Sequence, residues 1–176
     1  MLAKKTHIHI DVINVDTLSL VGKDVPKDKQ STAKRLPFFY FWLKDHYYQR
    51  SPDNFKQTTW SFSDDPRPIT KQQSLQDKHK ANNPDVIGLG IYTWNIDIML
   101  ENAKWYRKHF PNAIIIAGGP SAEATKEFFE ASPEIDLVIL GPGIEIFRRV
   151  IDSRVDGTQI HDIEGISYYK DDQVIK

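Results

Sequence analysis

The sequence contains no cysteine among its 176 residues. Disulfides, cysteine nucleophiles, thiolate zinc sites and cysteine-ligated iron–sulfur clusters are therefore excluded for this chain. Long hydrophobic runs are missing too, since no apolar stretch approaches the ~20 residues that a membrane-spanning helix needs. The N-terminus shows neither a long apolar core nor a small-residue cleavage site, so we expect no secretory signal and a cytoplasmic location.

An excess of charge of one sign is also lacking. The chain has 23 basic and 24 acidic side chains, which gives a net charge of −1. Without a basic excess there is no electrostatic argument for nucleic acid or for an anionic membrane, and we expect neither as a partner. Apolar residues make up 40% of the chain, and its length suffices for one domain with a real core.

The clearest pattern runs from residue 84 to residue 143. Short apolar runs at 85–91, 113–117 and 136–140 each end in a polar or glycine-rich turn, and the segments between them carry helix spacing. Strands that are apolar on both faces are typical of a parallel sheet covered by helices on both sides. The alternation of strands and helices predicts a doubly wound α/β layer.

The flanking segments complete this fold. Strands expected near 6–14 and 57–62 bring the sheet to five mainly parallel strands in the flavodoxin-like order 2-1-3-4-5. We therefore predict a doubly wound three-layer α/β sandwich over residues 1–159, followed by a C-terminal hairpin over 160–176. The other predicted segments are a long polar loop at 21–34, a buried aromatic helix at 36–48, a polar helix at 69–83 and a last helix at 144–154.

The loops after the central strands form the candidate ligand site, because ligands of such sheets bind beyond the carboxyl ends of the strands. Glycine there lets the backbone approach a ligand closely, and we expect a side chain at Gly119 to block the ligand's path. Helices expected to begin near Ser121 and Ile144 would offer free N–H groups. Tight turns without a ligand explain the same glycines, so the residues alone leave both interpretations open. The candidates are Thr93, Trp94, Asn95, Gly118, Gly119, Pro120, Gly141, Pro142 and Gly143.

Catalytic motifs are scarce. Neither glycine loop is a Walker phosphate loop or a G-x-G-x-x-G fingerprint, and the chain has no G-x-S-x-G or H-E-x-x-H. The acid pairs Asp64-Asp65 and Asp171-Asp172 stand in turn-like contexts, and we expect them to be solvated. Glu145 stands in the first turn of the last helix, where the helix dipole favours a carboxylate. We predict no catalytic residue and no metal-binding residue.

Several stretches together resemble one known family. The stretch 84–120, PDVIGLGIYTWNIDIMLENAKWYRKHFPNAIIIAGGP, looks like the cobalamin-binding domain at the N-terminus of many radical S-adenosylmethionine (SAM) enzymes. LVILGPGIEIFRRVI at 137–151 continues the resemblance, with GPGIEIF where that family typically has G-E-G-E-x-x-F. IEGISYY looks like the family's closing segment, and LPFFYFWLKDHYY takes the place of its first helix.

The resemblance implies a Rossmann-like domain that holds cobalamin at the carboxyl end of the sheet, within a radical SAM enzyme of the methyltransferase type. The corrin would lie over the loop after the first strand, close to Asn14, Asp16 and Leu18. The nucleotide tail would thread between the loops 93–95 and 118–120. The loop 141–143 and Glu145 complete the set of cofactor-binding residues that the resemblance implies.

The sequence departs from the family in two places. Domains that ligate cobalt through histidine carry Asp-x-His-x-x-Gly after the first strand, whereas the stretch from Asp16 to Gly22 has Leu18 at the histidine position. We therefore expect no histidine ligand from this loop. The radical domain needs Cys-x-x-x-Cys-x-x-Cys, so SAM and a four-iron four-sulfur cluster would belong to a catalytic domain outside this sequence, supplied in cis or in trans. Residues 160–176 would lead toward that domain.

Two alternatives stay open at the level of sequence. A cofactor-free Rossmann-like domain for interaction or scaffolding is favoured by the aromatic helix and by the missing histidine. A flavodoxin-like enzyme that uses a nucleotide is disfavoured, because the chain lacks a phosphate motif and an acid–base constellation. Retention of hydroxocobalamin by the purified protein would distinguish a cobalamin module from both alternatives.

Overall fold

The computed structural model describes residues 7–14, 36–63 and 67–176. Four features expected from the sequence lie outside these ranges: Asp16, Leu18, the loop 21–34 and the pair Asp64-Asp65.

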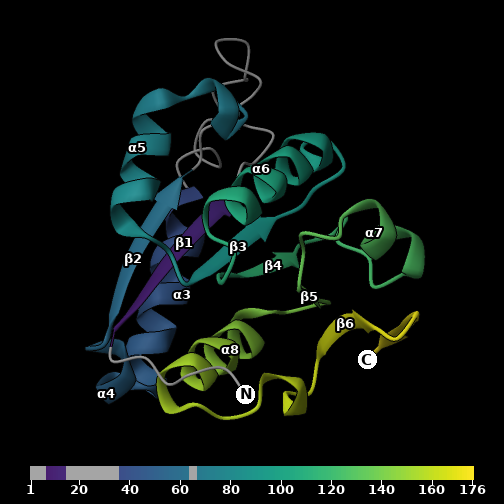
Figure 1. Ribbon diagram of the computed structural model, residues 1–176. Helices are drawn as coiled ribbons and strands as arrows, with labels where there is room; N and C mark the ends of the chain where they lie inside the picture. Colours follow the sequence, from purple (N-terminus) through teal and green to yellow (C-terminus); the bar gives the residue numbers. More distant parts are fainter. Residues whose placement is uncertain (1–6, 15–35, 64–66) are drawn as a thin grey trace, which may run out of the picture.

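The described strands form one seven-stranded sheet with the order β2-β1-β3-β4-β5-β6-β7 (Figure 1). The strands are β1 (Ile8–Asn14), β2 (Thr58–Ser63), β3 (Val86–Gly90), β4 (Ile114–Gly118), β5 (Leu137–Ile139), β6 (Ile166–Lys170) and β7 (Gln173–Ile175). The helices are α3 (Leu36–Arg50), α4 (Pro52–Phe55), α5 (Gln73–Asn82), α6 (Ile96–His109), α7 (Lys126–Ala131) and α8 (Ile144–Asp156). Short 3-10 turns, η2 (Ile69–Lys71) and η3 (Ile160–Asp162), precede α5 and β6.

The strand order predicted from the sequence is confirmed for β1 to β5, which are parallel, and β1 lies in the sheet interior between β2 and β3. The expected count of five strands is too low. The predicted hairpin is β6–β7, and it continues the sheet because Ile166 and Ser167 pair antiparallel with Ile139 and Val138. Without β6, the edge of β5 would present unpaired backbone groups.

Two core layers flank the sheet, which confirms the three-layer sandwich. Successive side chains of a strand point to opposite faces. In β4, Ile115 and Ala117 join the cluster that contains buried residues of α6 and α7, whereas Ile114 and Ile116 join the cluster that contains buried residues of α3 and α8. Figure 1 shows α5 and α6 above the sheet and α8 below it.

Glycines interrupt the sheet surface that faces α3 and α8. By the alternation along the strands, Gly88 and Gly90 of β3 share the face of Val86, and Gly118 of β4 shares the face of Ile116. Gly90 and Gly118 are direct neighbours across the two strands. Side chains are therefore missing at adjacent positions near the carboxyl edge, on the sheet face that α3 and α8 cover.

The helix after β4 begins later than the sequence predicted. The expected start near Ser121 is wrong, because α7 begins at Lys126. Thr125 caps α7, since its hydroxyl accepts a hydrogen bond from the N–H of Phe128 at 3.2 Å. The N–H of Ser121 instead donates a hydrogen bond to the carbonyl of Ile91 at 3.2 Å. No helix N-terminus therefore follows directly on the turn after β4.

Candidate cofactor site at the carboxyl edge of the sheet

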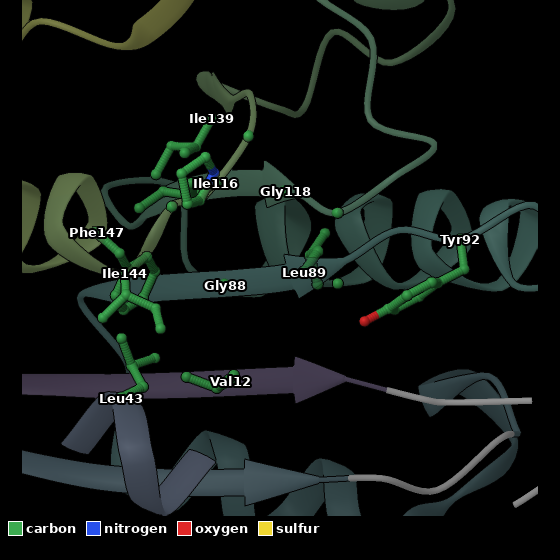
Figure 2. A pocket seen from close by; sticks show the side chains of 15 residues that line it. Val12, Leu43, Gly88, Leu89, Tyr92, Ile116, Gly118, Ile139, Ile144 and Phe147 are labelled. Carbon is green, nitrogen blue, oxygen red and sulfur yellow. The ribbon is translucent and has the colours of Figure 1, made fainter. Parts of the chain in front are cut away.

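A cavity of about 290 Å³ opens at the carboxyl ends of the central strands, on the side of α3 and α8 (Figure 2). None of the described residues that line it is charged, so the cavity suits an apolar or aromatic group. The lining consists of Val12, Leu43, Gly88, Leu89, Gly90, Tyr92, Ile116, Gly118, Gly119, Ile139, Gly141, Pro142, Gly143, Ile144 and Phe147.

The cavity exists because the strands beneath it lack side chains. A Cβ at Gly118 would meet only the carbonyl oxygen of Ile139, at 3.8 Å, so the space above Gly118 is open. A Cβ at Gly88 would lie 3.0 Å from the ring of Phe147, which therefore fills the position of a side chain there. Glycine therefore leaves open space above residue 118 and makes room for Phe147 at residue 88.

Gly119 lines the cavity, and its backbone conformation also requires glycine. Its φ is +107°, and a Cβ there would lie 2.5 Å from the carbonyl oxygen of Ile91. A side chain at Gly119 would therefore meet the backbone of Ile91, and the expectation that it blocks the ligand's path stays a prediction. The strain of the left-handed region adds to this clash.

The loops after β3 and β4 are bonded to each other. The N–H of Ile91 donates to the carbonyl of Gly118 at 2.7 Å, and the hydroxyls of Thr93 and Ser121 lie 3.1 Å apart. These bonds join the two loops between which the nucleotide tail was expected to thread, and that path stays a prediction. The cavity is lined by the Gly118-Gly119 turn and by the loop 141–143.

The loop after β3 presents aromatic rings at the cavity. Asn95 is fully buried, where its side chain accepts from the N–H of Tyr92 at 2.8 Å and donates to the carbonyl of Gly90 at 3.0 Å. Asn95 thus holds the loop in shape. Trp94 is 43% exposed, and its ring stacks on that of Tyr92 at 4.9 Å. Tyr92 lines the cavity, and its ring extends toward the carboxyl end of β1 (Figure 2).

The loop 141–143 forms the opposite rim. Gly141 has a φ of +75° and faces open space, whereas a Cβ at Gly143 would lie 2.8 Å from the side chain of Ile139. α8 begins directly after this loop, as the sequence predicted, and Gly157 ends it with a φ of +82°. The first N–H groups of α8 therefore lie at the rim.

Glu145 points away from the lining. Its carboxylate accepts from Nε of Arg148 at 3.0 Å and lies 2.9 Å from Nε2 of His46. These hydrogen bonds, that from Arg148 above all, lower the pKa of Glu145 to about 2. In the structure Glu145 joins α8 to α3 and is not one of the cavity residues.

A buried pair of polar groups lies on the other face of the sheet. Asp11 of β1 and His79 of α5 form a hydrogen bond there, and both are 1% exposed. Within 7–14, 36–63 and 67–176, no group of three or more histidine, aspartate or glutamate side chains is arranged to hold a metal ion. In the same ranges no helix has the length and apolarity to cross a membrane.

The structure brings together some predicted site residues and separates others. Gly118, Gly119 and the loop 141–143 line the cavity, whereas Thr93, Trp94, Asn95, Pro120 and Glu145 do not. Asn14 ends β1 at the same edge, opposite Gly90. Sequence reasoning missed Val12, Leu43, Gly88, Leu89, Gly90, Tyr92, Ile116, Ile139, Ile144 and Phe147. For the glycines a signal was available, because strand alternation places residues 88, 90 and 118 on one face.

A parallel α/β sandwich with an apolar cavity at the carboxyl edge of its sheet defines a Rossmann-like ligand-binding domain. The profile of the family described as "B12 binding domain" matches residues 62–151, just over half of the chain. The chain belongs to the B12-binding domain family.

Sequence comparison also finds curated proteins that are similar to part of this chain. Over 73 residues, 41% of this chain, the sequence is 34% identical to the cobalamin-dependent radical SAM methyltransferase TokK of Streptomyces tokunonensis. Over 74 residues, 42% of this chain, it is 30% identical to 2-(S-pantetheinyl)-carbapenam-3-carboxylate methyltransferase of Streptantibioticus cattleyicolor. The matched part is 11% of the length of each relative.

Solved structures share the fold at low identity. The cobalamin-dependent SAM radical enzyme OxsB, with aqua-cobalamin and SAM bound, superposes with a TM-score of 0.63 and 17% identity. The radical SAM methyltransferase TsrM of Kitasatospora setae superposes with a TM-score of 0.59 and 12% identity. Each match covers 96% of this chain but only 22% of the OxsB chain and 29% of the TsrM chain.

Proposed function

We propose that this chain is the cobalamin-binding module of a radical SAM enzyme of the methyltransferase type. The observation that carries the proposal is the glycine-floored apolar cavity at the carboxyl edge of a B12-binding domain. The relatives named above, two of which carry cobalamin in their names, support the same conclusion for the protein as a whole.

The dimensions of the cavity fit one part of cobalamin. At about 290 Å³ it is far too small for the corrin but admits a flat, apolar bicyclic base. We propose that the base of the nucleotide tail enters over Gly90 and Gly118, where no Cβ stands in its way. The corrin then lies outside, over the carboxyl ends of the strands, where Trp94 and Leu140 are both 43% exposed.

Several predicted site residues have proposed roles in this arrangement. Trp94 and Thr93 would contact the corrin from the loop after β3. Pro120, together with the loop 141–143, would flank the tail where it enters, and Asn14 would adjoin the corrin from the end of β1. Glu145 would act through Arg148 and α3, since it does not line the cavity.

The residues of this chain bind, orient and exclude water, and we assign none of them a covalent role. Bound cobalamin would supply a cobalt centre able to carry a methyl group. The apolar lining would hold the tail away from solvent, and the tied loops after β3 and β4 would present a fixed surface to the corrin.

We propose that cobalt receives no histidine ligand from the loop after β1, because Leu18 stands at the histidine position. The cobalt(II) form should show no nitrogen superhyperfine splitting from a protein histidine in its electron paramagnetic resonance spectrum. Leu18→His should introduce that splitting. A histidine splitting in the wild type would refute the assignment.

The remaining parts of the enzyme would be supplied by a radical SAM domain, in cis or in trans, with its SAM and four-iron four-sulfur cluster. We propose that the Rossmann-like domain spans 1–159 and that 160–176, which includes β6 and β7, leads toward that catalytic domain. The cytoplasmic location expected from the sequence stays a prediction, which fractionation of cells that express the protein would test.

Cofactor retention tests the proposed function directly. Purified protein is mixed with hydroxocobalamin and passed over a desalting column, and the cobalamin absorbance is followed in the protein fraction. We expect stoichiometric co-elution. Folded protein that elutes without cobalamin would overturn the proposal and favour a cofactor-free interaction domain.

A further inference from the structure

Two helices form the wall of the cavity. Leu43 of α3 and Ile144 and Phe147 of α8 are the helical residues that line it. One helical turn beyond Leu43 lies Tyr47, and one turn beyond Ile144 lies Arg148. Polar side chains therefore join α3 and α8 beside the apolar residues that the two helices share in one core cluster.

Asp152 of α8 is the centre of this polar contact. Its Oδ1 accepts from the hydroxyl of Tyr47 and from Nδ2 of Asn54, each at 2.8 Å. Its Oδ2 accepts from the hydroxyl of Ser51 at 2.8 Å and from Arg148. Three of these four donors come from α3, α4 and the residue between them, so one carboxylate joins that segment to α8.

The network is shielded from water, so its polar groups depend on one another as hydrogen-bond partners. The side chains of Arg148 and Asp152 are 17% and 15% exposed, and Tyr47 is fully buried. Burial, together with the hydrogen bond to Asp152, raises the pKa of Tyr47 well above its ordinary value. Without the carboxylate, the Tyr47 hydroxyl would lose its acceptor inside the protein.

The sheet does not depend on this contact. The floor of the cavity is set by the hydrogen-bonded pair β3–β4, in which Gly90 neighbours Gly118. The distance between the floor and Leu43, in contrast, depends on how α3 sits against α8. A change at Asp152 should therefore alter the cavity and leave the rim, where the corrin would lie, in place.

Resting on the proposed function, we infer that Asp152 is a positioning residue for the nucleotide tail. By holding α3 against α8 it sets the width of the cavity, and so the preference of the domain for cobalamin over cobinamide, the corrin that lacks the nucleotide tail. Asp152 itself touches neither ligand.

The experiment measures the dissociation constants of cobalamin and cobinamide by equilibrium dialysis. Wild type should bind cobalamin more tightly. Asp152→Ala should lower the ratio of the two affinities roughly tenfold, about 1.4 kcal/mol, with cobinamide affinity unchanged.

The matched control is Asp172→Ala. Asp172 also accepts from a tyrosine and a cation, Tyr169 and Lys126, each at 2.7 Å, but lies in the β6–β7 turn away from the cavity. The control should leave both affinities unchanged.

A ratio that Asp152→Ala leaves unchanged would overturn the inference, and so would an equal loss of affinity for both corrins, which marks a general structural role. If wild type retains no cobalamin, the proposed function itself fails, which is a different outcome. Should Asp152→Ala not fold by circular dichroism, Tyr47→Phe removes one of the four donors. It should lower the ratio in the same direction, and an unchanged ratio in that variant overturns the inference.

Discussion

Gly118→Val fills the proposed tail cavity from its floor. Gly118 lies in β4, its φ is not positive, and the nearest atom to a Cβ would be the carbonyl oxygen of Ile139 at 3.8 Å. The backbone therefore accepts valine without strain, and a β-branched residue suits a strand. We expect the free energy of unfolding to stay the same or to rise slightly.

The loss of binding follows from what the valine displaces. Its methyl groups would enter a cavity of only about 290 Å³, so the base of the tail would no longer be buried there. Full burial of a large apolar group is worth about 1.5 to 3 kcal/mol. Losing it should raise the dissociation constant of cobalamin by roughly 10- to 150-fold.

The assay is equilibrium dialysis of cobalamin, with cobinamide as the ligand that the change should leave unaffected. Gly157→Ala serves as the opposite control. Gly157 ends α8 with a φ of +82° and does not line the cavity, so alanine there should cost stability, about 1 kcal/mol or more, while folded molecules keep their affinity. Wild-type affinity for cobalamin in Gly118→Val would refute the assignment of the cavity to the tail.

Two other predictions concern the folded state. The pKa of Glu145 is about 2 in the folded protein against an ordinary 4.5, so its interactions stabilise the fold fully above about pH 4.5, and this contribution is lost as the pH falls toward 2. The difference in unfolding free energy between wild type and Glu145→Gln should therefore be constant above pH 4.5 and shrink below it; a constant difference down to pH 2 would contradict the pKa. Thr125→Ala removes the cap of α7 and should cost about 1 kcal/mol in urea denaturation without changing cobalamin retention. Unchanged stability would show that the hydroxyl does not cap the helix.

The sequence predicted the strands well because each is a short apolar run closed by glycine or a polar turn. The strand expected at 85–91 is β3 at Val86–Gly90, and the one expected at 113–117 is β4 at Ile114–Gly118. Periodicity identifies a strand but not its neighbour, so the pairing of β6 with β5 was not predicted.

The site was predicted less completely, for a physical reason. Residues at strand ends can be placed from the sequence, because parallel strands end at one edge. Leu43 and Phe147 meet at the cavity across about a hundred residues of chain, and no spacing in the sequence records that contact. The same holds for Tyr47 and Asp152.

The hydrogen bonds between the loops after β3 and β4 also affect how substitutions in these loops combine. Ile91 donates to Gly118 and accepts from Ser121, and Thr93 lies 3.1 Å from Ser121 through their hydroxyls, so neither loop is independent of the other. Substitutions in residues that share partners do not add, and coupling energies of about 0.5 to 3 kcal/mol are usual. The effects of substitutions at Thr93 and at Ser121 should therefore be compared in double-mutant cycles rather than one at a time.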